Sequence, residues 1–207
     1  MFEYISQHPI AGIALLLLGF LTVFVCIMAM ISGRKRSEER ARIIADIERE
    51  KALRKEFKYV DESTFLPEKD NYRLVVGMCA HIQQSIETQE DMVKVFNGLS
   101  EVKQYVYALG YVFEDGKNAL SDFFRANGEP LLTAAEKAVS DVIGGRYSDL
   151  FSLMYSMFDE NDESVSVDEK KIESLDNEIN EIINEKGESI YTCAADYIRQ
   201  NKAEFLN

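Results

Sequence analysis

The residues of this chain that come closest to a metal-binding pattern are acidic. Asp159, Asn161 and Glu163 occupy alternate positions, as the calcium ligands of an EF-hand loop do. An EF-hand loop also needs glycine at its sixth position and glutamate at its twelfth, where this chain has Ser164 and Lys170. Because two central requirements fail, we do not expect a calcium site.

No residue pattern predicts catalysis either. Cys79 and His81 are two residues apart on an expected helix, and side chains with that spacing do not face each other. The chain has three Cys, two His and no CxxC spacing, which argues against a zinc site. With 36 Asp and Glu, neighbouring carboxylates are expected by chance, and the sequence contains no phosphate-binding glycine loop or nucleophile elbow. We therefore expect a protein without catalytic residues, metal or cofactor.

An apolar segment from Ile10 to Ile31 determines where all of these residues lie relative to a membrane. The chain has no charged residue between Glu3 and Arg34. At about 1.5 Å per residue, a helix over this segment reaches about 33 Å, which is enough to cross the hydrocarbon core of a bilayer. We expect a single-pass transmembrane helix, with residues 1–33 forming the extracytoplasmic end and the anchor.

The charges beside this segment predict its orientation. Arg34, Lys35 and Arg36 follow it almost directly, and cationic flanks stay on the cytoplasmic side of a membrane. We expect the N-terminus outside the plasma (inner) membrane and the remainder of the chain in the cytoplasm. A cleaved signal peptide is the alternative, but its basic residues would precede the apolar run.

One face of the expected anchor consists mostly of small residues. They recur at intervals of three or four and include Gly12, Gly19, Thr22, Cys26 and Ala29. Small residues let two helices approach closely in lipid. We expect this seam to pack on another transmembrane helix, either in a homodimer or with a partner subunit. A chance clustering of small residues is the other interpretation.

Charge is distributed unevenly after the anchor. Residues 34–58 contain ten Lys or Arg and six Asp or Glu, whereas residues 59–207 contain thirteen and twenty-nine. The acidic part repels nucleic acid, so we expect no direct binding to DNA or RNA. It favours a basic protein partner, or it keeps the domain soluble.

Two short segments are expected between the anchor and the acidic part. Residues 34–58 form a basic helical stalk without Gly or Pro. Its thin apolar stripe comprises Ile43, Ile47, Leu53 and Phe57. The stalk is solvated, forms a short coiled coil or lies on the anionic inner leaflet, and we favour a stalk whose first turns touch lipid head groups. Residues 59–70 are polar and contain Pro67, which is typical of a linker.

From Asn71 onward, apolar residues recur with a helical period and strand-like alternation is scarce. We expect an all-α acidic domain of about seven or eight helices over residues 71–207. The expected helices cover residues 71–87, 89–97, 100–114, 117–126, 131–143, 146–158, 168–186 and 188–206. The chain is expected to break at Gly144-Gly145, and Asp168 suits the amino terminus of the next helix.

Part of this domain resembles a known family. The similar blocks are Val106–Glu129, Ala135–Met154, Ser174–Ile182 and Tyr197–Phe205. Over residues 99–205 the chain looks like a bacterial family of all-helical acidic domains, mostly uncharacterised and named for a DNA-mimic protein. The family usually shows Asn-Gly-Gly-Phe where this chain has Asp-Gly-Lys-Asn-Ala at residues 115–119. The resemblance implies a scaffold with a negative surface, which in the namesake imitates the phosphates of DNA.

These observations together predict a membrane-anchored cytoplasmic protein-interaction module that presents an acidic surface to a basic protein. The candidate partner-binding residues are Asp159, Glu160, Asp162 and Glu163. A structural subunit of a membrane complex, packed through its transmembrane helix, is one alternative. An enzyme with an unrecognised carboxylate site is another.

Overall fold

The computed structural model describes residues 40–41, 43–68, 70–158 and 168–206. Within these residues the chain is all-helical and contains no strand, which confirms the expected all-α class. The chain divides into two units, Met1–Lys51 and Ala52–Asn207, which are described separately. No helix of the described residues is long and apolar enough to cross a membrane, and the expected anchor, Ile10 to Ile31, lies outside them.

In the first unit, residues 40–41 and 43–51 are helical. Ile43, Ile44 and Ile47 are 53%, 57% and 45% exposed. Two residues of the expected apolar stripe, Ile43 and Ile47, and the neighbouring Ile44 are therefore exposed on this helix.

The second unit starts with residues that the sequence assigned to the stalk. Leu53 and Phe57 are buried in its hydrophobic core. A Cβ at Gly77 would overlap the ring of Phe57, so the ring lies directly over the backbone of α3 (Asn71–Ile86). The Phe57 carbonyl oxygen also lies 2.8 Å from His81 Nδ1. Residues 52–58 thus pack against α3, a contact that their own basic composition does not predict.

The expected linker also contributes to the core. It contains a single turn of 3-10 helix, η1 (Glu62–Phe65), which Asp61 caps by accepting a hydrogen bond from the Ser63 backbone N–H. Phe65 is buried against Phe205, with 6.4 Å between the ring centroids. The segment is thus attached to the core through Phe65 and through Val60, which packs against it.

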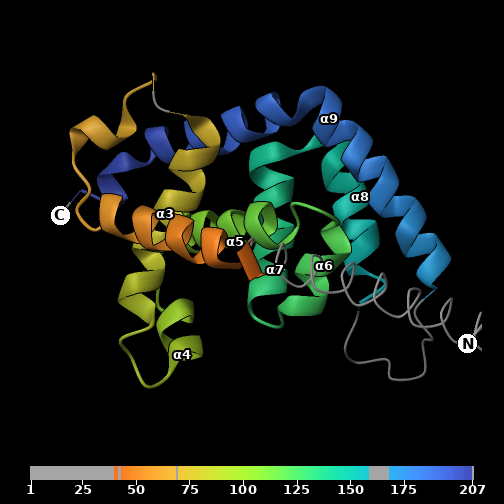
Figure 1. The fold of residues 1–207 in the computed structure, drawn as a ribbon, viewed down its shortest axis with the longest axis horizontal. Helices are drawn as coiled ribbons and strands as arrows, with labels where there is room; N and C mark the ends of the chain where they lie inside the picture. The colour runs from red at the N-terminus through yellow and green to blue at the C-terminus, as the bar shows by residue number, and fades with distance from the viewer. Residues whose placement is uncertain (1–39, 42, 69, 159–167, 207) are drawn as a thin grey trace, which may run out of the picture. The chain divides into compact units, whose positions relative to one another are not determined.

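The central layer of the second unit consists of α3 and α5 (Glu101–Asp115), which lie side by side (Figure 1). The short helix α4 (Met92–Asn97) connects them. Asp70, Asp91 and Ser100 cap these three helices, each by accepting a hydrogen bond from a backbone N–H three residues later. The two long helices match the predicted ranges closely, because both have strong apolar periodicity and a capping residue.

The next helices form a second group. They are α6 (Leu120–Ala126), α7 (Leu131–Ala138) with its π-helical extension η2 (Val139–Ile143), and α8 (Gly145–Tyr155). In this group, α6 and α7 pack against α5, and α8 packs against α7 and η2. Between η2 and α8 the chain turns at Gly144, with φ 66° and ψ −166°, and at Gly145, with φ 61°. Residues with a side chain rarely adopt this conformation, so the glycine pair fixes the turn.

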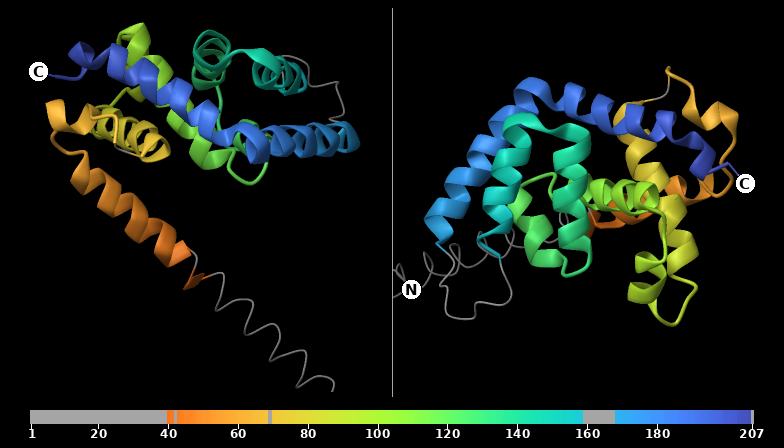
Figure 2. Two further views of the ribbon diagram at one scale, coloured as in Figure 1. Left: turned by 90° about the horizontal axis from the view of Figure 1, so that it is seen from above. Right: turned by 180° about the vertical axis from the view of Figure 1, so that it is seen from behind.

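A single long helix, α9 (Glu169–Gln200), closes the second unit. It contacts α3, α5, α6 and α8, and it changes direction near its middle (Figures 1 and 2). The prediction of two helices separated at Gly187 is therefore wrong. One glycine costs a helix only about 1 kcal/mol, and the buried residues Ile179 and Ile190 on either side of it hold α9 against the other helices.

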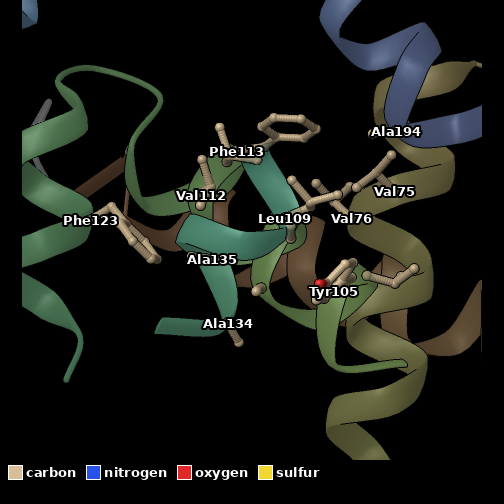
Figure 3. Packing of buried hydrophobic residues seen from close by; sticks show 14 of the residues in the cluster. Val75, Val76, Tyr105, Leu109, Val112, Phe113, Phe123, Ala134, Ala135 and Ala194 are labelled. Atoms are coloured by element: carbon tan, nitrogen blue, oxygen red, sulfur yellow. The ribbon is translucent and has the colours of Figure 1, made fainter. Parts of the chain in front are cut away.

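The hydrophobic core surrounds α5. Figure 3 shows Leu109 and Val112 of α5 among side chains from α3, α6, α7 and α9. Ala135 of α7 and Ala194 of α9 are fully buried, and these small residues let their helices approach α5 closely. The core thus fixes the position of α9, whose outer face remains in contact with solvent.

Candidate acidic interaction site

The site residues predicted from the sequence lie outside the described residues. The predicted partner-binding residues are Asp159, Glu160, Asp162 and Glu163. The predicted transmembrane packing residues are Gly12, Gly19, Thr22, Cys26 and Ala29. Both sets therefore remain predictions.

The residues at the two ends of the acidic segment 159–167 are described, and both lie at α6. On one side, the ring of Phe158 stacks on Phe124, with 5.4 Å between the centroids, and Arg125 lies 5.6 Å from the Phe158 centroid. On the other side, Arg125 donates a hydrogen bond of 2.8 Å to Glu169, the first residue of α9. Arg125 therefore contacts one residue before this segment and one after it, Phe158 and Glu169.

The structure identifies a second acidic region along α9. This helix begins at Asp168, whose side chain accepts a hydrogen bond from the Lys171 backbone N–H, as the sequence predicts. The Asp176 carboxylate is buried and accepts hydrogen bonds from the Ser121 backbone N–H at 3.0 Å and the Ser121 hydroxyl at 2.6 Å. It thereby caps the amino end of α6, which has no capping side chain of its own. This contact fixes the rotation of α9 about its axis.

With that rotation, three glutamates of α9 line a groove of about 400 Å³. Glu178, Glu181 and Glu185 form one wall, and the turn at Gly144-Gly145 with Arg146 forms the other. Apolar and aromatic side chains contribute the rest of the lining: Ile143, Tyr147, Ile182 and Ile190. Burial raises the pKa of the Tyr147 phenol, so this side chain stays neutral at physiological pH.

The charges in this groove are only partly compensated. Arg146 donates a hydrogen bond to Glu178, and Lys186 also borders the groove. Among the described residues, no hydrogen bond or ion pair involves the side chain of Glu181 or Glu185. Two carboxylates are therefore free to accept a hydrogen bond from outside the protein.

A larger cleft, of about 570 Å³, lies between the start of α5 and α7, and hydrogen bonds already engage two of its polar side chains. The Gln104 side-chain amide donates to the carbonyl oxygens of Phe96 and Leu99. Glu129 accepts hydrogen bonds from the Tyr155 hydroxyl at 2.7 Å and the Thr133 backbone N–H at 3.2 Å. Several polar groups of this cleft thus bond to one another, whereas Glu181 and Glu185 do not bond to the described residues of the groove, so we regard the α9 groove as the better candidate for binding.

The described residues contain no group of three or more His, Cys, Asp or Glu that could hold a metal ion. Cys79 Sγ lies 3.3 Å from the Tyr107 carbonyl oxygen, and burial raises the pKa of its thiol. His81 contacts the Phe57 carbonyl oxygen. Both residues thus make structural contacts within the core layer of α3 and α5.

The α9 groove is not predicted from the sequence. The spacing of Glu178, Glu181 and Glu185 places them on one helical face, and that signal is visible in the sequence. Nothing in the sequence indicates that the Gly144-Gly145 turn would lie opposite them, because that contact depends on the packing of α8 against α9.

Comparison of the chain with protein-family models, with curated proteins and with solved structures finds no match. The function must therefore be argued from the residues and the geometry described above.

Proposed function

We propose that the chain is a membrane-anchored protein-interaction module that uses the acidic face of α9 to bind a basic protein. The observation that carries this proposal is the pair of unengaged carboxylates, Glu181 and Glu185, beside an apolar groove lining. Two further features of the sequence support the membrane location: the uncharged segment from Ile10 to Ile31 and the cations that follow it.

The groove suits the side chain of a lysine or arginine from the partner. The aliphatic stem of such a side chain packs on apolar surface while its charged head stays with polar groups. Ile182 and Ile190 supply the apolar contact, and Glu181 and Glu185 supply the acceptors. Hydrogen bonds between charged groups are about twice as strong as neutral ones, so both carboxylates contribute to selecting a basic partner.

A more specific form of the proposal is imitation of nucleic acid. From Glu178 to Glu185 the helix rises about 10 Å, and the carboxylates within that length form a row of negative charges. The resemblance to the DNA-mimic family supports this form. It requires a partner that normally binds nucleic acid, and duplex DNA would then compete with the chain for that partner.

The test is affinity purification of the full chain from detergent-solubilised membranes, with the co-purifying proteins identified. Replacing Glu178, Glu181 and Glu185 by Gln removes three negative charges from the groove. We expect the affinity for the specific partner to fall at least about tenfold, which corresponds to about 1.4 kcal/mol.

A matched control removes the same charge elsewhere. Glu68, Glu90 and Glu204 are exposed and lie outside the groove, so their replacement by Gln should leave binding nearly unchanged. Equal losses in both triple variants would show that only net charge matters. Binding that survives about 0.5 M salt would instead favour packing through the transmembrane helix, because surface electrostatics are largely screened under those conditions.

The anchor is tested separately. We expect the full chain to stay with the membrane fraction after washing at alkaline pH, and its C-terminal unit to resist protease added outside intact cells. Recovery of the chain in the soluble fraction, or cleavage of that unit from outside, would contradict the proposed membrane location and orientation.

A further inference from the structure

The first unit contains an exposed apolar patch that the proposed function does not use. Ile43, Ile44 and Ile47 are each 45% exposed or more. All three lie in one helical stretch of five residues, 43–47. Single exposed apolar residues are common on protein surfaces, but a contiguous group marks a surface that binds something.

The patch is continuous with two cations. Arg40, Ile44, Ile47 and Lys51 follow one another at intervals of four, three and four, which places them in one straight row along a helix. Ile43 lies beside this row. Arg40 and Lys51 are both exposed, one at each end of the isoleucines. The acidic residues of the same stretch, Asp46, Glu48 and Glu50, do not fall in the row.

This arrangement does not suit pairing with a second copy of the helix. Parallel pairing along the row would bring Arg40 against Arg40 and Lys51 against Lys51. Antiparallel pairing centred between Ile44 and Ile47 would bring Arg40 against Lys51. Both arrangements oppose like charges beside the apolar contact, which weakens association.

A bilayer with anionic lipids does suit it. Isoleucine side chains enter the boundary between head groups and acyl chains, while Arg and Lys at the two ends bind the lipid phosphates. The sequence supplies a reason for proximity, because the uncharged segment that ends at Ile31 lies only a short distance before Arg40 in the chain.

We infer that the helix of residues 40–51 lies flat on an anionic lipid surface, with Ile44 and Ile47 facing the bilayer. This inference rests on the proposed membrane anchoring. It selects one of the three arrangements that the sequence left open for the stalk. The helix then holds the start of the second unit close to the membrane surface rather than away from it.

The experiment compares two neighbouring positions on opposite faces. The full chain is reconstituted in nanodiscs of phosphatidylcholine, with or without phosphatidylserine, and a polarity-sensitive fluorophore is attached to Ile44→Cys or to Ala45→Cys. Cys26 and Cys193 are replaced by Ala, and Cys79 is buried. Ala45 is the matched control, because it is exposed and equally close to the anchor but lies away from the row.

We expect a blue shift of the emission at position 44 and none at position 45, with the shift present only in discs that contain phosphatidylserine. Replacing Arg40 and Lys51 by Gln should abolish it. Water-like emission at both positions would overturn the inference in favour of a solvated stalk. A shift at position 44 that is independent of phosphatidylserine and depends on the number of chains per disc would overturn it in favour of self-pairing.

Retention of the chain on the discs is measured in the same samples. If the chain is not retained on discs of either composition, the proposed anchor is wrong and the inference fails with it. If the chain is retained and positions 44 and 45 do not differ, only the inference is wrong.

Discussion

The contact between α3 and α5 and the contact between α9 and α6 stabilise the second unit in different ways. Between α3 and α5 the helices approach through a glycine: a Cβ at Gly110 would overlap the Cβ and Sγ of Cys79. Between α9 and α6 the contact depends on a buried carboxylate, Asp176, that accepts two hydrogen bonds from Ser121. The first contact is limited mainly by the size of the side chains, whereas the second depends on directional hydrogen bonds.

This difference explains where the candidate site lies. Between α3 and α5, the close approach is limited by the size of the side chains at positions 79 and 110. The inner face of α9 buries apolar residues together with Asp176, and Glu181 and Glu185 remain exposed on the outside. The α3–α5 layer is thus the scaffold, and α9 carries the exposed glutamates of the candidate site.

The largest loss of stability is expected from a substitution in the scaffold, at the contact between α3 and α5. Gly110→Ala should lower the free energy of unfolding by about 3 kcal/mol, because the added methyl group forces α3 and α5 apart and tightly packed cores do not relax easily. Urea denaturation would measure the loss.

Its control removes the opposing atoms. Gly110→Ala should cost less stability when it is introduced into the Cys79→Gly variant than when it is introduced into the unsubstituted chain. If the losses of stability from Cys79→Gly and Gly110→Ala simply added in the double variant, the contact between these two residues would not set the distance between α3 and α5.

The second effect concerns the polar contact. Asp176→Ala should cost about 2 kcal/mol, because the backbone N–H and hydroxyl of Ser121 lose their acceptor in a buried place. Glu181→Gln on the same helix is the control and should change stability by less than about 0.5 kcal/mol. If the two variants unfolded at the same urea concentration, the Asp176 contact would not be what orients α9.

A third prediction contrasts two glycines. Gly187→Ala should raise the free energy of unfolding by about 0.5–1 kcal/mol, since alanine favours the helix and loses less entropy on folding. A Cβ at this position would lie 3.4 Å from Ile183 Cγ2 and 3.7 Å from Tyr191 Cε2, which are ordinary contacts. A loss of stability similar to that of Gly110→Ala, in the same urea titration, would mean that α9 is packed as tightly as the scaffold.

The smallest effect is expected at the scaffold surface. Hydrogen bonds from Arg54 lower the pKa of Glu87 below its ordinary value of 4.5. The pair therefore stabilises the folded state above that pH, and the contribution is lost as the pH falls through the lowered pKa of the folded protein. Because the Glu87 side chain is 39% exposed, solvent screening limits the contribution to about 0.5 kcal/mol.

Thermal unfolding, followed from neutral pH down to the acidic range in which Glu87 is protonated, would measure the contribution of this pair. Glu87→Gln should be slightly less stable than the unsubstituted chain at neutral pH, and the two should converge in acid. A difference that persisted below the pKa of the folded protein would indicate that the glutamine disturbs packing rather than removing a charge.

Local features of the fold could be predicted from the sequence, and contacts between distant segments could not. The caps at Ser100 and Asp168 and the glycine break at Gly144 follow from rules about neighbouring residues. The burial of Phe57 and Phe65 does not, because the surfaces that cover them belong to other parts of the chain: α3 covers Phe57 and Phe205 packs on Phe65.

The same distinction applies to the candidate site. The row of glutamates on α9 is visible as a helical spacing, but the opposite wall of the groove comes from residues about forty positions earlier in the chain. Gly187 shows the reverse error, since a local rule predicts a helix end where packing on both sides keeps α9 continuous. Functional sites built between helices therefore require the tertiary structure.

The position of α9 in the chain also has a consequence for biosynthesis. Ala194 and Ile198 are fully buried against helices that the ribosome makes much earlier, so those helices cannot complete their core until α9 has been translated. In the interval, apolar surface of α3 and α5 stays uncovered and available to chaperones. A nonsense mutation upstream of α9 would leave that surface permanently uncovered, and we expect the product to be degraded rather than to accumulate as a smaller working protein.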